Sequence, residues 1–206
     1  MKPRHTPRPV PSQPSRLHST AAQVYDLLDP PLWLVTSVHG ETRGGLIATF
    51  ATRASIVGEM PRMVLGVAKQ HHTWGLIQAA RRFSLHLLFP DQIDLVWRFG
   101  LHSGKEADKF ADMELGFTPA GNPLVPHTLA WLDCLVEEEM DTGDRSVYLA
   151  AVESAGTNGE AQPLTLRRLF ADAPEGRRRQ LDELYARDGE IDATAILRWR
   201  EQRHRP

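Results

Sequence analysis

The sequence predicts a mainly β domain with peripheral helices, folded as a closed or split barrel and followed by a helical C-terminal appendage. Between residues 33 and 153, short apolar or alternating segments recur with turn residues between them, which is typical of an all-β domain. From residue 163 onward, apolar residues recur at helical spacing instead. Barrel closure would remove the exposed strand edges of such a domain.

The first expected elements follow a proline-rich start. Residues 1–19 hold five of the fifteen prolines and four basic residues, so we expect a disordered basic tail. A short helix is expected at 21–28, where Pro30 and Pro31 prevent its continuation. The barrel domain is expected to span residues 20–158.

The expected strands of this domain are apolar or alternating runs. The run 83–89 alternates, which places Phe83, Leu85, Leu87 and Phe89 on one face. Helical pieces are expected at 73–82 and 91–101. The expected strands are 33–38, 46–52, 63–68, 83–89, 131–140 and 146–153.

Residues 163–206 form the expected helical C-terminal extension. One helix is expected around Leu166, a second from Pro174 to a stop at Gly189, and a third capped by Asp192. Residues 160–206 contain ten arginines and nine acidic residues. We therefore expect these helices to pack on the barrel rather than to bind nucleic acid.

Composition excludes several classes of protein. The 206 residues carry a net charge of -2, which argues against a protein built mainly to bind nucleic acid. The single cysteine, Cys134, excludes an intramolecular disulfide and a four-cysteine zinc site. No apolar run reaches transmembrane length, and the start lacks the apolar core of a secretory signal. We expect a soluble, cytoplasmic protein without a membrane partner.

The most informative segment is 67–77, where a buried strand leads through a polar loop into a helix. Thr73 is the expected N-cap, and the free N–H groups behind it attract anions. Lys69, His71 and His72 add a charge and ring donors, so phosphate would suit this loop, although an ordinary capped helix explains the pattern equally well. The two adjacent histidines lack a third partner at ligand spacing, so no metal is expected.

Two further segments are weaker on their own. Gly44 and Gly45 precede small and hydroxyl-bearing residues, which leaves a surface that a flat ligand could approach, or simply a glycine hairpin before an edge strand. The segment 101–110 is a loop with two lysines. No nucleophile elbow, metalloprotease or nucleotide-loop motif is found, so the catalytic residues stay unassigned.

Taken in order, these segments resemble the flavin reductase-like family of FMN-binding split barrels, flavoredoxin-type members included. The resemblance covers about residues 20–155 and rests on several short motifs in the family's order. The segments that carry it are 46–55, a strand led by Pro61, 67–77, Asp108-Lys109-Phe110 after Ser103-Gly104, 131–134 and 143–152.

The resemblance implies a homodimer with one flavin per subunit, FMN ahead of FAD, and a flavin reductase-like oxidoreductase that uses NAD(P)H. It places the flavin ring against 48–52 and the phosphate in the loop 71–73, with Lys109 reaching the flavin or its phosphate. The cofactor-binding residues expected here are Ala48, Thr49, Phe50, Ala51, Thr52, Lys69, His71, His72, Thr73 and Lys109.

The chain departs from the family pattern at two places. His71 and His72 replace the usual Ser and Arg of the phosphate loop, so no fixed charge is supplied there. Arg145 replaces a histidine that lies near the nicotinamide in reductase members. A non-catalytic flavin-binding electron carrier or flavin store is therefore the alternative function, while a guanidinium there could also favour the 2′-phosphate of NADPH.

Overall fold

The computed structural model describes residues 16–102, 104 and 108–203. These residues divide into two compact units, one up to Pro30 and one from Pro31 onward. The first unit contains α1 (Arg16–Tyr25). This helix begins inside the stretch expected to be a tail and ends three residues before the predicted Leu28, because Leu27 and Leu28 form tighter turn bonds to Val24 and Tyr25. The expected disorder of residues 1–15 falls outside the described residues.

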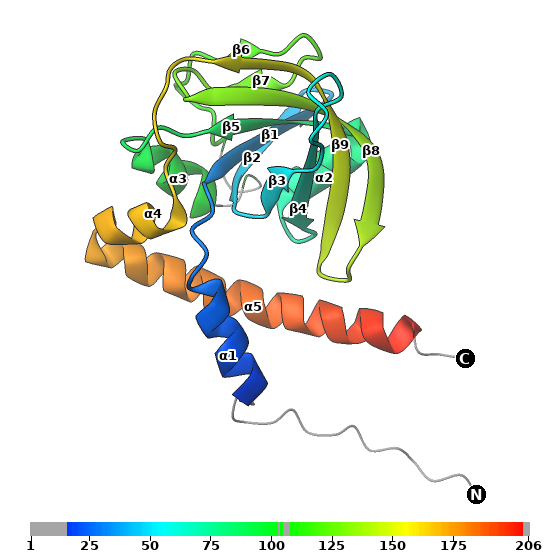
Figure 1. Cartoon of the computed structure of the whole chain (residues 1–206), viewed down its shortest axis with the longest axis vertical. Helices are drawn as coiled ribbons and strands as arrows, with labels where there is room; N and C mark the ends of the chain where they lie inside the picture. Colours follow the sequence, from blue (N-terminus) through cyan, green and yellow to red (C-terminus); the bar gives the residue numbers. More distant parts are fainter. Residues whose placement is uncertain (1–15, 103, 105–107, 204–206) are drawn as a thin grey trace, which may run out of the picture. The chain divides into compact units, whose positions relative to one another are not determined.

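The second unit is built on a curled antiparallel sheet (Figure 1). In the described part of the chain, seven strands follow the order β2-β1-β5-β8-β9-β4-β3, and β6 pairs with β7 separately. The predicted mainly β split barrel with a helical C-terminal part is confirmed. The strands are β1 (Trp33–His39), β2 (Thr42–Ala48), β3 (Ala51–Arg53), β4 (Arg62–Ala68), β5 (Arg82–Leu87), β6 (Gly116–Phe117), β7 (Pro123–Leu124), β8 (Ala130–Asp141) and β9 (Arg145–Thr157).

The single strand predicted at 46–52 is wrong, because the chain breaks at Thr49 and Phe50 into β2 and β3. These two strands lie at opposite edges of the sheet, β2 beside β1 and β3 beside β4. The corner between them therefore carries the chain from one edge of the sheet to the other. Its carbonyl at Phe50 accepts a 2.8 Å hydrogen bond from the N–H of Gly66 on β4.

The strand β5 is buried on both faces rather than on one. Phe83 and Leu85 are fully buried as predicted, but so are Ser84 and His86 on the other face. The strand ends at Leu87, and Leu88 is buried in place of the expected Phe89. Phe83 and Leu85 pack into the first hydrophobic cluster. On the other face, Ser84 donates to Asp133 and His86 bonds to the Leu34 carbonyl and the Val125 N–H, so both faces are covered.

Helices cover the sheet and divide its apolar side chains into two clusters. The first cluster includes Leu65, Ile77 and Phe83 and takes in α2 (His72–Ala80). The second cluster joins α3 (Ile93–Gly100), α4 (Leu166–Asp172) and α5 (Glu175–Arg203) to the barrel, with Leu169 and Leu181 buried. The C-terminal helices therefore pack on the barrel, as predicted.

Among the described residues of this C-terminal part there are two helices, not three. The predicted stop at Gly189 and cap at Asp192 are wrong, since α5 runs through both residues (Figure 1). A glycine inside a helix costs only about 1 kcal/mol relative to alanine. Contacts with the barrel on the far side offset that cost: Asp192 forms an ion pair with Arg145, and the Trp199 side chain lies against Gly143. No helix among the described residues is long and apolar enough to cross a membrane.

Candidate functional site

The start of α2 lies against β2 because Gly44 and Gly45 leave room for it and for α3. A Cβ at Gly44 would lie 2.8 Å from Leu76 Cδ1 and 3.0 Å from Thr73 Oγ1, and one at Gly45 would lie 2.7 Å from Phe99 Cδ1. Of the two readings offered for these glycines, the glycine hairpin before an edge strand fits the structure, since both lie on β2, which pairs with β1 at the edge of the sheet. Side chains of α2 and α3 occupy the space that a side chain at either glycine would need.

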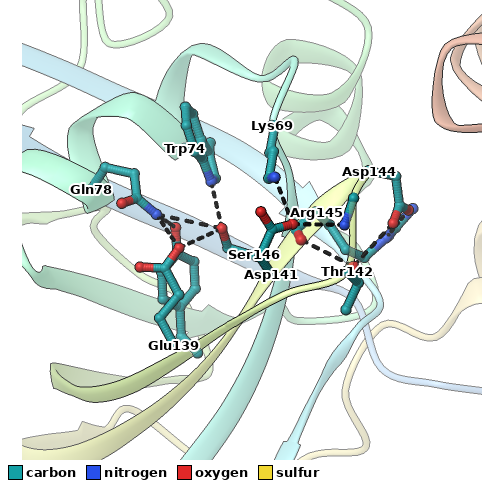
Figure 2. Close-up of polar contacts among 11 residues, drawn as sticks. Lys69, Trp74, Gln78, Glu139, Asp141, Thr142, Asp144, Arg145 and Ser146 are labelled. Carbon is teal, nitrogen blue, oxygen red and sulfur yellow. Dashed lines mark hydrogen bonds and ion pairs between the residues drawn. The ribbon is translucent and has the colours of Figure 1, made fainter. Parts of the chain in front are cut away.

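A polar network fixes the other side of α2 to the β8–β9 hairpin (Figure 2). Trp74 Nε1 donates to Ser146 Oγ at 2.9 Å, and Ser146 Oγ donates to Glu139 Oε1 at 2.6 Å. Gln78 Nε2 donates to Glu139 Oε1 at 2.5 Å and to the Tyr148 hydroxyl at 2.7 Å. These bonds hold α2 in place, so the position of its first turn is well defined.

Two cavities adjoin at that first turn. One, called here the polar cavity, has a volume of about 300 Å³ and lies at the start of α2. The other, the apolar cavity, has a volume of about 280 Å³ and lies beside the β2–β3 corner. They adjoin because they share the lining residues Leu46, Gln70, His71, Gly100, Leu184 and Asp188.

The structure brings most of the expected site residues to these cavities. Ala48, Thr49 and Phe50 line the apolar cavity, and His71 lines both. The other three residues line the polar cavity: His72, Thr73 and Lys109.

The remaining three expected residues lie away from the cavities. Ala51 and Thr52 belong to β3 and line neither cavity. Lys69 also lines neither, and its Nζ lies 2.6 Å from Asp141 Oδ1 at the β8–β9 turn (Figure 2). The sequence predicted that Lys69 would lie at the phosphate loop. Its side chain is instead directed to Asp141, a carboxylate at the end of β8.

The N-cap of α2 is His71 rather than the predicted Thr73. His71 has an extended backbone with φ -73° and ψ 138°, and no side chain caps the helix. Thr73 is the second helical residue and is buried, with a 2% exposed side chain. The Trp74 N–H donates to the His71 carbonyl at 3.1 Å and no side chain caps the turn, so an anion in the polar cavity would meet the positive end of the helix dipole.

Charges surround the His71 imidazole at the junction of the cavities. Burial lowers the pKa of His71 most strongly, Asp188 opposes this, and Lys109, Arg145 and Arg187 lower it further. The imidazole is therefore neutral near pH 7 and can donate one hydrogen bond. The junction thus holds charges of both signs, with Asp188 opposite Lys109, Arg145 and Arg187.

Arg145 lines the apolar cavity, and its guanidinium has three close contacts. Its Nε lies 2.5 Å from Asp144 Oδ2, its Nη2 lies 2.7 Å from Asp192 Oδ2, and its guanidinium lies 4.7 Å from the centre of the Phe50 ring. Two carboxylates thus neutralise the residue that stands where the resembling family has histidine. This arrangement does not favour the suggested binding of a second phosphate by Arg145.

Sequence reasoning missed the contribution of α5. Leu184, Arg187, Asp188 and Ile191 line the polar cavity from this helix. Their spacing is that of an ordinary amphipathic helix, so no local signal distinguishes them from surface residues.

Gln70 lies at the junction of the two cavities. Its side chain lines both cavities, and its buried Oε1 has no hydrogen-bond partner. Buried polar atoms are almost always satisfied in proteins. Trp33 Nε1 and Ser154 Oγ are also buried without a partner and line neither cavity, so the unpaired Oε1 does not by itself indicate a ligand.

Neither metal chemistry nor thiol chemistry is indicated at the described residues. No group of three or more His, Cys, Asp or Glu there could hold a metal ion. Cys134 is fully buried, and burial raises the pKa of its thiol, which disfavours the reactive thiolate.

Comparison with known proteins gives a consistent family. The model of the flavin reductase like domain matches residues 26–171. The chain is 32% identical over 133 residues to the flavin-dependent monooxygenase reductase subunit HsaB of Mycobacterium tuberculosis, covering 65% of this chain and 68% of that protein. It is 30% identical over 136 residues to the high molecular weight rubredoxin of Moorella thermoacetica, covering 65% of this chain but only 58% of that protein.

A solved structure agrees with these matches. Nitrilotriacetate monooxygenase component B of Mycobacterium thermoresistibile superposes with a TM-score of 0.64 at 26% identity, covering 73% of this chain and 82% of that one. This chain and that protein therefore share a fold as well as sequence similarity.

Proposed function

Because the chain belongs to the flavin reductase-like family, we propose that it binds a flavin across the two cavities and acts as an oxidoreductase. The observation that supports this most is the adjacency of an apolar cavity at the β2–β3 corner and a polar cavity at an uncapped helix start. A flavin has the same division, with a flat aromatic ring at one end and a phosphate at the other.

The residues present fit FMN in one orientation. Ala48, Thr49 and Phe50 would lie against the ring, while His72, Thr73 and Lys109 would surround the phosphate. The ribityl chain between ring and phosphate must then cross the junction, which Gln70 and His71 line. We propose FMN ahead of FAD because the first turn of α2 offers one anion site beside the polar cavity.

The protein itself would bind the flavin and exclude water from its ring. A bound flavin supplies the electron and hydride transfer. The buried side chains of Leu169 and Leu181 close the apolar cavity on one side and limit water at the ring. Neutral His71 donates at the junction, and buried Lys109 keeps its ammonium between the carbonyls of Gly45 and Phe99, at 3.0 Å and 2.7 Å.

We propose NAD(P)H as the reductant and reduced flavin as the product, as in a reductase component. The name of the Mycobacterium tuberculosis relative, a reductase subunit of a flavin-dependent monooxygenase, supports this assignment. Use of NAD(P)H in turn favours the cytoplasm, where this reductant is available.

Stopped-flow mixing of the FMN-loaded protein with NADH and with NADPH tests the activity. A reductase loses its oxidised-flavin absorbance within the turnover time with at least one of the two nucleotides. The alternative, an electron carrier or flavin store, is favoured by one observation: Arg145 is tied to Asp144 and Asp192 beside the proposed ring position. Reduction by dithionite but by neither nucleotide would favour that alternative.

We also propose a homodimer. The β2–β3 corner and the loop after β3 expose apolar side chains that a second subunit could cover, with Phe50 62%, Met60 65% and Ile56 92% exposed. Such patches are uncommon on monomers unless they bind something. Phe50 also lines the apolar cavity, so a dimer through this corner would help to enclose the proposed ring site.

A further inference from the structure

The helix α5 forms one wall of both cavities, although it lies far from them in sequence. Leu184 and Asp188 line both cavities, and Arg187 and Ile191 line the polar one. The helix is joined to the barrel on either side of these residues. Leu181 is buried in the second cluster, and Asp192 forms an ion pair with Arg145 on β9.

The polar cavity has few sources of fixed positive charge. Among its described lining residues, only Lys109 and Arg187 carry one. Lys109 is buried, and its Nζ already donates to two backbone carbonyls. His71 is neutral because burial and neighbouring cations lower its pKa. Of these two cations, Arg187 is the exposed one, so it can add a charge-assisted contact to those proposed for Lys109.

Arg187 has the geometry to make that contact. Its guanidinium lines the polar cavity and is close enough to His71 to act on it electrostatically. Its side chain is 67% exposed, and its Nε lies 3.3 Å from Asp188 Oδ1, a single weak pair between neighbours in the chain. A guanidinium offers several N–H donors in a plane and binds phosphate in a bidentate manner, so this pair leaves further donors for a ligand.

We propose that Arg187 binds the flavin phosphate and makes the site select FMN over riboflavin. The proposal rests on the flavin-binding function above and adds to it a residue from α5. Asp188 then holds Arg187 near the cavity when no phosphate is bound. The C-terminal helix becomes part of the binding site rather than an appendage, because it supplies charge that the loop at 71–73 lacks.

The test compares FMN and riboflavin binding in Arg187→Gln, Arg187→Lys and the wild type, by fluorescence titration of the full-length protein. Loss of one charge-assisted hydrogen bond to phosphate at a partly exposed site should weaken FMN binding roughly tenfold. Riboflavin has no phosphate, so its affinity should stay within about twofold, and Arg187→Lys should keep part of the FMN affinity.

Two further variants separate this proposal from the proposed function. Arg198→Gln removes an exposed arginine of the same helix that lines neither cavity, so it should change neither affinity. Thr73→Ala tests the phosphate position without Arg187 and should weaken FMN binding but not riboflavin binding.

Each outcome then has one meaning. Selective loss of FMN affinity in Arg187→Gln, with Arg198→Gln unchanged, supports the proposal. Unchanged FMN affinity in Arg187→Gln, with selective loss in Thr73→Ala, overturns it and leaves the proposed function standing. Equal loss of both flavins in Arg187→Gln also overturns it, since the residue then only shapes the cavity. A wild type that binds neither flavin overturns the proposed function itself.

Discussion

Acidification should destabilise this protein through one buried histidine. His86 on β5 is fully buried, its Nδ1 lies 3.1 Å from the Leu34 carbonyl, and its Nε2 accepts the N–H of Val125 at 3.2 Å. The ring must therefore be neutral with its proton on Nδ1. A second proton on Nε2 would oppose the Val125 N–H and leave a buried charge.

The size of the effect follows from the pKa. Burial lowers the pKa of His86 from 6.5 to about 4, against smaller opposing effects of the Leu34 hydrogen bond and Asp133. Between these values the unfolded chain binds a proton that the folded chain does not, so stability falls as the pH falls. At 1.36 kcal/mol per pKa unit, the loss between pH 7 and pH 4 is about 3 kcal/mol.

Urea unfolding of the wild type and of His86→Gln at several pH values in this range measures the effect. A glutamine amide can donate to Leu34 and accept from Val125 without titrating. The stability difference between the two proteins should therefore shrink by about 3 kcal/mol as the pH falls to 4. Other acidic groups such as Asp133 are present in both proteins and cancel. An equal loss of stability in both proteins would refute the reasoning.

Two further predictions concern packing and assembly. Leu181→Ala removes a 5% exposed side chain that joins α5 to the barrel, so unfolding free energy should fall by about 2–4 kcal/mol in urea titrations. The control Leu197→Ala removes a 52% exposed leucine of the same helix and should change stability by less than about 0.5 kcal/mol; equal effects would mean that α5 is not packed as described. Sedimentation should give a dimer, and a monomer over a wide concentration range would contradict the proposed homodimer.

The local sequence pattern was sufficient to predict strands that are apolar runs bounded by turn residues. The strands at 63–68 and 146–153 were predicted within a few residues, because apolar runs between turn residues record burial directly. The break at Thr49 and Phe50 was missed because it depends on two strands lying at opposite edges of a curled sheet. Strand propensity does not indicate which edge of a sheet a residue will occupy.

The site was predicted on its barrel side and missed on its helical side. The loop 71–73 could be found because a strand, a polar loop and a helix follow one another in the chain. Arg187 could not, because only tertiary packing brings it to the polar cavity. Lys69 was misplaced for the same reason, since its partner Asp141 comes from a strand 72 residues away.

A crystal structure of the full-length protein with FMN tests the central proposal most directly. The account predicts the flavin ring in the apolar cavity beside Ala48, Thr49 and Phe50, and the phosphate in the polar cavity within hydrogen-bond distance of Thr73. A flavin bound outside these cavities, or in them with its phosphate directed away from the start of α2, would contradict it.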